Sequence, residues 1–79
     1  MIYYVALPFV HVDDGLAPGQ AVECHHERAA IRRAQALATN EGNAGAIAFS
    51  RRGGPDIGEF DDAVILKTFG EVPDDFDMA

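Results

Sequence analysis

The feature that most constrains the fold is an apolar run at residues 2–10. Its odd-numbered and its even-numbered positions are both apolar, so a strand formed by this run would be hydrophobic on both faces. β-Branched and aromatic side chains dominate this run, which is typical of a β-strand. Its two faces consist of Tyr3, Val5, Leu7 and Phe9 on one side and Ile2, Tyr4, Ala6 and Val10 on the other. Because both faces are apolar, we expect this strand at the centre of a sheet. Pro8 cannot donate a backbone hydrogen bond, so the pairing should end or bulge near it.

One segment, from about residue 27 to residue 41, has the periodicity of an amphipathic helix. Its apolar stripe consists of Ala30, Ile31, Ala34, Leu37 and Ala38. Because most of these side chains are small, the helix should pack closely against a sheet. Glu27 suits the positive end of the helix dipole, and Gly42 is placed to end the helix.

Three further segments, residues 20–24, 44–51 and 63–69, have the composition of strands. In the second of them the small residues Ala46, Ala48 and Ser50 share one side, where we expect the alanine-rich helix to dock. The predicted fold class is therefore α+β, with the order ββαββ. We expect a four-stranded antiparallel sheet, in the order 2-1-3-4, with one helix packed on one face. Residues 1–72 should form a single domain, followed by an acidic tail at residues 73–79.

A single helix covers only one face of such a sheet, so the other face should remain apolar. The interaction candidates on that face are Tyr3, Val5, Ile65 and Phe69, or the alternate positions of the same strands. An uncovered apolar face of this kind usually marks a contact with a partner. Two-fold homodimers are the commonest soluble oligomers, so we expect self-association or binding to another protein.

Charge and cysteine content exclude several classes of function. The 79 residues include 6 Lys and Arg against 13 Asp and Glu, for a net charge of -7, which disfavours nucleic-acid and anionic membrane partners. Residues 54–79 carry the whole excess, because Lys67 is their one base. Cys24 is the single cysteine, so no intramolecular disulfide can form. We expect a cytoplasmic protein without a cofactor.

The segment Cys24-His25-His26, together with His11, is a weak candidate for a metal site. Thiolate and imidazole groups are zinc ligands, and His11 could approach Cys24 or His26 if the first two strands pair. The alternative is a small core cysteine with exposed histidines before a helix. Cys24 could also serve as a nucleophile with a neighbouring histidine as base, but a small domain with an alanine-lined helix leaves little room for a substrate pocket. We therefore do not expect an enzyme.

Two groups of arginines are further candidates for binding. Arg51 and Arg52 precede two glycines whose backbone N–H groups could hold an anion, or they could pair with acidic residues across a hairpin. Arg28, Arg32 and Arg33 form a basic patch on the helix. This patch is either a solvated face or a docking place for the acidic tail, in the same subunit or in a neighbouring one.

The sequence contains four segments of particular interest: Ala29-Ala30-Ile31-Arg32-Arg33-Ala34, Gly45-Ala46-Ile47-Ala48-Phe49-Ser50-Arg51, Gly58-Glu59-Phe60-Asp61-Asp62-Ala63 and Phe69-Gly70-Glu71-Val72-Pro73. Together they resemble a group of short bacterial proteins without an assigned function. The resemblance covers about half of the chain. It implies a bacterial cytoplasmic protein and transfers no catalytic residue to this sequence.

Two functional hypotheses follow. The first is a protein-interaction or structural module that acts as a homodimer through its sheet and an acidic edge. The alternative is a small-ligand, anion or metal-binding protein that uses His11, Cys24 and His26, or the Arg51-Arg52 loop.

Overall fold

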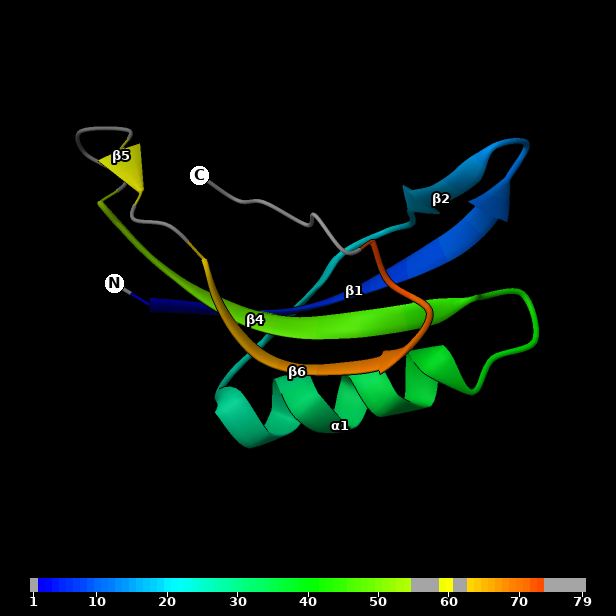
Figure 1. Ribbon diagram of the computed structural model, residues 1–79. Coiled ribbons are helices and arrows are strands. Elements are labelled where there is room, and N and C mark those ends of the chain that lie inside the picture. The colour runs from blue at the N-terminus through cyan, green and yellow to red at the C-terminus, as the bar shows by residue number, and fades with distance from the viewer. Residues whose placement is uncertain (1, 55–58, 61–62, 74–79) are drawn as a thin grey trace.

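An antiparallel sheet with one helix packed against one of its faces forms the fold (Figure 1). The computed structural model describes residues 2–54, 59–60 and 63–73. Within these residues the elements are β1 (Ile2–Val12), β2 (Gly15–Pro18), β3 (Val22–Cys24), α1 (Glu27–Ala38), β4 (Gly45–Gly54), β5 (Glu59–Phe60) and β6 (Val64–Gly70). The predicted α+β class and the antiparallel sheet are confirmed.

β1 and β4 form the centre of the sheet and pair from Ile2↔Arg52 to Phe9↔Gly45. On its other edge β1 pairs with β3 at residues 4–6 and with β2 at residues 9–12. Pro8 falls in the gap between these partners, and its carbonyl accepts a hydrogen bond of 2.8 Å from the Gly19 N–H. The interruption expected at Pro8 therefore occurs on this edge, while the pairing with β4 continues through it.

The strand count and order differ in detail from the prediction, because two further short strands join the described sheet. β2, which the sequence presented as part of a turn region, extends the edge of β1. β5 pairs with the end of β4, at Gly53↔Phe60 and Gly54↔Glu59, where we had expected a loop. β6 pairs with the rest of β4. These additions need only backbone hydrogen bonds, which leave little trace in the pattern of side chains.

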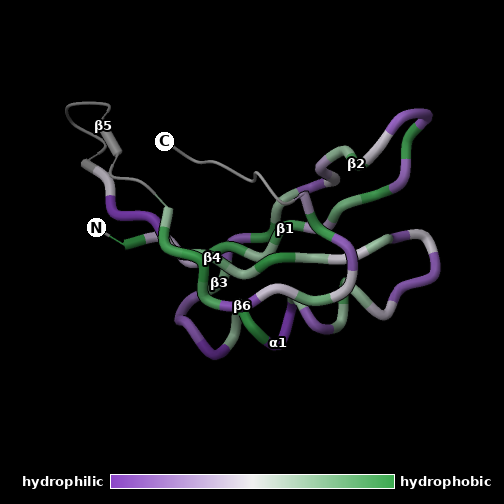
Figure 2. Tube along the Cα trace, viewed as in Figure 1, coloured by the Kyte–Doolittle hydropathy of each residue, from purple (hydrophilic) through white to green (hydrophobic). Residues whose placement is uncertain are grey.

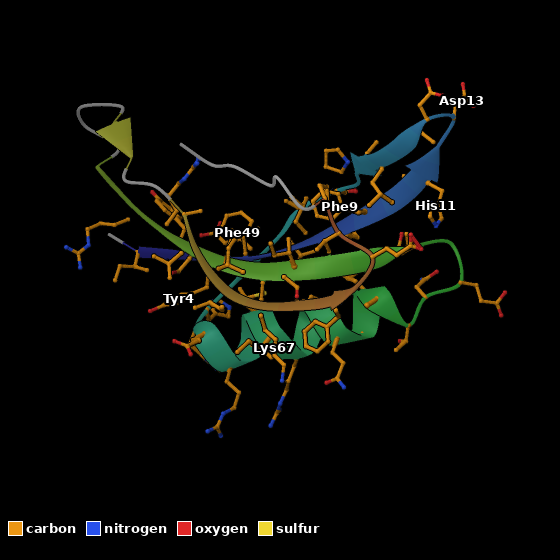
Figure 3. The ribbon with its side chains drawn as sticks, in the orientation of Figure 1. Tyr4, Phe9, His11, Asp13, Phe49 and Lys67 are labelled. Atoms are coloured by element: carbon orange, nitrogen blue, oxygen red, sulfur yellow. The ribbon has the colours of Figure 1, made fainter. Side chains whose placement is uncertain are left out.

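α1 packs on the small side of β4, as predicted. A fully buried cluster of alanines joins helix and sheet; it consists of Ala6, Ala30, Ala34, Ala46 and Ala48. Because each contributes only a methyl group, the helix backbone lies close to the strands. Tyr4 and Lys67 lie on this same side of the sheet in Figure 3.

The helix ends at Ala38, three residues before the predicted end at Glu41. Polar side chains donate hydrogen bonds to the last backbone carbonyl groups of the helix. The Thr39 hydroxyl donates to the Ala36 carbonyl at 2.8 Å, and the Asn43 amide donates to the Leu37 carbonyl at 2.9 Å. These bonds satisfy backbone groups that a helix end leaves unpaired, so the chain turns before it reaches Gly42.

A β-bulge in β6 separates two residues that we had expected on one face. The pairing shifts between Ala48↔Lys67 and Phe49↔Ile65, so that Leu66 is the extra residue. As a result Phe69 and Leu66 pack against the alanine cluster. The prediction that Phe69 shares the face opposite the helix is therefore wrong, whereas Ile65 pairs with Phe49 on that face. A bulge changes which side the following residues occupy.

The face of the sheet opposite α1, here called the open face, is covered in part by the chain itself. Phe9, Ile47 and Phe49 form a buried cluster on it. Leu16, Ala63 and Val72 pack against this cluster from outside the central strands. Figure 3 shows Phe9 and Phe49 on this side, away from the helix. The expectation of a wholly uncovered second face is thus corrected: only part of it remains accessible.

Figure 2 shows the resulting distribution of hydropathy. Hydrophobic residues follow β1 and β4, whereas hydrophilic residues gather in the turn between β1 and β2 and in the segment that leads from α1 to β4. Both ends of the sheet bend away from the helix in Figure 1, which makes the open face concave.

Candidate functional site

The accessible part of the open face is organised by a row of side chains that crosses four strands. Val5 of β1 pairs with Glu23 of β3 on one side and with Phe49 of β4 on the other. Phe49 in turn pairs with Ile65 of β6. Register partners lie on the same side of a sheet, so all of these side chains point to the open face. With strands about 4.8 Å apart, the row is roughly 14 Å wide.

A groove lies beside this row. It is lined by Tyr3, Val5, Ala21, Glu23, Phe49 and Arg51, and its volume is about 390 Å³. We call it the open-face groove. Tyr3 and Arg51 are register partners in β1 and β4, which places both in the row next to that of Val5. The floor of the groove is apolar, and its charged side chains come from two different strands.

The charges stand on opposite sides of the groove. Glu23 belongs to β3 and Arg51 to β4, and β1 runs between these strands. One rim of the groove is therefore acidic and the other is basic. An apolar floor between rims of opposite charge favours a ligand or partner that presents an apolar group and charges of both signs.

One exposed apolar side chain, that of Ile65, extends the open face toward the sheet edge, whereas the exposed Ile2 and Val64 lie on the helix side. On β6, Val64 is 59% exposed and Ile65 is 43% exposed, and Ile2 at the start of β1 is 45% exposed. Ile65 continues the row of the groove, whereas Val64 pairs with Ser50 on the side of the helix. β6 has no partner beyond it among the described strands.

The predicted metal candidates do not come together. Cys24 pairs with Tyr4, seven positions along β1 from His11, which corresponds to about 23 Å. His11 lies at the far end of β1 with Asp13 (Figure 3), and its Nε2 is 3.5 Å from a carboxylate oxygen of Glu71. Among the described residues no group of three or more His, Cys, Asp or Glu side chains could hold a metal ion.

Cys24 and His26 have local roles instead. Cys24 packs against the alanine cluster, and its thiol donates to the Val22 carbonyl at 3.7 Å. His26 is the N-cap of α1, and its Nδ1 accepts a hydrogen bond of 3.2 Å from the Ala29 N–H. An imidazole thus fills a position that Ser, Thr, Asp or Asn usually occupies.

The two anion candidates point to opposite sides of β4. Arg51 pairs with Tyr3 and lines the open-face groove, whereas Arg52 pairs with Ile2 and is exposed. Successive side chains of a strand alternate, so the two guanidinium groups do not converge on one anion. Gly53 and Gly54 belong to β4 and pair with β5 rather than forming an open loop. Predicted pairing partners at residues 56, 61 and 62 lie outside the described residues.

The basic patch lies on the outer side of α1, where Arg28 and Arg32 are exposed. A hollow of about 350 Å³ runs along the helix there, lined by His26, Ala29, Arg32, Arg33 and Ala36. This side is turned away from the sheet, and Val72 packs on the opposite face of the sheet. The predicted contact with this patch concerns the acidic segment from Glu71 to Asp77. Glu71 lies 3.5 Å from His11, and residues 74–77 lie outside the described residues.

The sequence did not indicate Ala21, Glu23 or Phe49 as parts of a site. Glu23 alternates with Val22 and Cys24 in the sequence, which was the available sign that it faces away from the helix. Its position across the groove from Arg51 follows only from the pairing of both strands with β1.

Comparison with known protein families, with curated proteins and with solved structures finds no match for this chain. In the part of the chain that the structure describes, no helix has the length and apolar character needed to cross a membrane.

Proposed function

We propose that the protein is a small interaction module that self-associates into a two-fold homodimer through the open face of its sheet. The observation that carries this proposal is the open-face groove, with its apolar floor and its rims of opposite charge. Apolar surface that a soluble domain leaves accessible commonly marks a contact with another protein.

The charges favour a second copy as the partner. In a two-fold interface the same patch faces itself, and an axis parallel to the strands brings a residue on one rim to the opposite rim of the other protomer. A two-fold axis through the groove sets Glu23 of each protomer beside Arg51 of its partner. The contact of Glu23 with Arg51 then occurs twice, and the apolar residues Val5, Phe49 and Ile65 lie between the two contacts.

Charge reversal tests this arrangement. Glu23→Arg places two arginines opposite each other at both contacts, and Arg51→Glu does the same with two glutamates. Each variant alone should dimerise at least about tenfold more weakly than the original protein, a change of ~1.4 kcal/mol, because like charges across an interface are costly. An equimolar mixture of the two variants should form a heterodimer, because each now carries the complement of the other.

Sedimentation equilibrium in the micromolar range measures all of these associations. Arg28→Glu makes the same change of charge on the helix side and serves as the control, with an unchanged dimerisation constant. A protein that stays monomeric throughout this range, or single variants whose mixture does not associate, would refute the proposal.

A small apolar anion is the second candidate occupant. The groove has a volume of about 390 Å³ and contains Arg51, and pockets for small ligands start near this size. Titration with benzoate, followed by NMR, should shift the signals of Tyr3 and Val5. Loss of that response in Arg51→Glu, with its retention in Arg52→Glu, would support a specific site. Equal responses in both variants would argue against it.

A further inference from the structure

The described chain ends on the same face of the sheet as the open-face groove. After β6 the backbone crosses over Gly45, where the Glu71 N–H donates to the Ala44 carbonyl at 3.1 Å. Val72 then packs against the cluster of Phe9, Ile47 and Phe49. In Figure 1 the orange-red end of the described trace lies on the side opposite α1. The last described residues, Val72 and Pro73, therefore follow the crossing of the chain onto the open face.

The groove is within reach of the residues that follow Pro73. Phe49 belongs to the cluster on which Val72 packs, and it also lines the groove. Phe76 is four positions beyond Val72, which corresponds to an extended length of about 13 Å. The distance from Phe49 across β1 to Glu23 is only two strand spacings, or about 10 Å.

The chemistry of the acidic tail complements the groove. Its sequence Pro73-Asp74-Asp75-Phe76-Asp77 presents one aromatic side chain among acidic ones. The groove offers apolar residues for the aromatic ring and the guanidinium group of Arg51 for a neighbouring carboxylate. The basic hollow on α1 is another cationic surface of the described residues, but helix and sheet both stand between it and Val72.

We propose that the acidic tail folds back across the open face of its own subunit and seats Phe76 in the open-face groove. The tail is thereby an intramolecular competitor for the surface that the dimer uses. This regulatory consequence rests on the proposed function, whereas the docking of Phe76 does not. A tethered segment acts at a high effective concentration, so docking in the same subunit is favoured over docking in a neighbour.

The docking is measured with a tryptophan reporter. The sequence contains no Trp, so Phe76→Trp introduces a single one. Its emission should be shifted to the blue, and its quenching by acrylamide should be at least about twofold weaker than that of Met78→Trp, the matched control two positions along the tail. Adding Arg51→Glu to the Phe76→Trp protein should remove most of this protection, while adding Arg52→Glu should retain it.

The concentration dependence identifies the occupied groove. Protection of the tryptophan that is already present in dilute protein, and that falls only at concentrations where the dimer forms, supports docking within one subunit. Protection that appears only at high concentration places the tail in the groove of a second copy and overturns the proposal, as does a reporter that is quenched as readily as Met78→Trp.

The competition is measured on a chain that ends at Pro73. If the tail occupies the groove nine-tenths of the time, about one protomer in ten has a free groove, and a dimer needs two such protomers. Removal of the tail should therefore tighten dimerisation about a hundredfold in sedimentation equilibrium. Phe76→Ala should act in the same direction. If the truncated chain stays monomeric while the tryptophan of the full-length Phe76→Trp protein is protected, the proposed dimer is contradicted and the docking of the tail is still supported.

Discussion

Gly45 is the position at which a single methyl group should do most damage to this fold. A Cβ atom there would lie 2.5 Å from the Glu71 nitrogen and from the Phe69 carbonyl oxygen, and closer still to the Glu71 carbonyl oxygen. All three are backbone atoms, so no side chain can rotate away. Gly45→Ala therefore forces the chain after β6 to move off the open face.

The cost follows from two contributions. Overfilling a packed site costs typically 1–3 kcal/mol, so we take about 2 kcal/mol. Displacing the half-buried Val72 adds about 1 kcal/mol of lost apolar burial. The more restricted unfolded chain of an alanine variant returns about 0.5–1 kcal/mol. We expect Gly45→Ala to lower the free energy of unfolding by about 2 kcal/mol, which corresponds to a fall in Tm of roughly 10 °C for a domain of this size.

Urea unfolding followed by far-UV circular dichroism measures this difference as a shift of the midpoint at constant slope. Gly15→Ala is the matched control, because a Cβ atom at Gly15 has nothing within 4 Å and the φ of neither glycine is positive. We expect this control to be neutral or slightly stabilised. If Gly45→Ala proved as stable as Gly15→Ala, the crossing of Glu71 over Gly45 would be refuted.

Three further substitutions test separate parts of the fold by the same unfolding measurement. Ala34→Leu overfills the fully buried alanine cluster and should lower the free energy of unfolding by about 2–3 kcal/mol. Ala36→Leu, on the exposed side of α1, should change it by less than about 0.5 kcal/mol. Equal effects of the two substitutions would contradict the close packing of the helix. His26→Asp supplies a better N-cap and an acidic group at the start of the helix. It should raise the free energy of unfolding by about 0.5–1 kcal/mol relative to His25→Asp. A larger gain from His25→Asp would rule out the observed cap. Gly70→Ala should lower the free energy of unfolding by at least about 1–2 kcal/mol, because Gly70 has a φ of +68° and a Cβ atom there would lie 2.7 Å from the Ala44 carbonyl oxygen. An unchanged unfolding midpoint would contradict this backbone conformation at Gly70.

Local patterns in the sequence were sufficient for the two main layers of the fold. The central position of β1 followed from a run that is apolar on both faces. The docking of α1 on β4 followed from small residues at helical spacing in one segment and at alternate positions in the other. Ala34 and Ala48 meet because neither has a side chain large enough to keep the backbones apart. Side-chain size and periodicity belong to each segment alone, so the sequence displays them directly.

The candidate site required the tertiary structure. Glu23 and Arg51 are far apart in the sequence, and only their pairing with β1 brings them to the same groove. Phe69 and Ile65 occupy opposite faces because of a bulge that exists only between paired strands. Local sequence thus specifies the helix and the strands β1, β3, β4 and β6, whereas β2 and β5 depend on pairing with a neighbouring strand. The register between distant strands, set by hydrogen bonds common to every residue, decides which side chains share a surface.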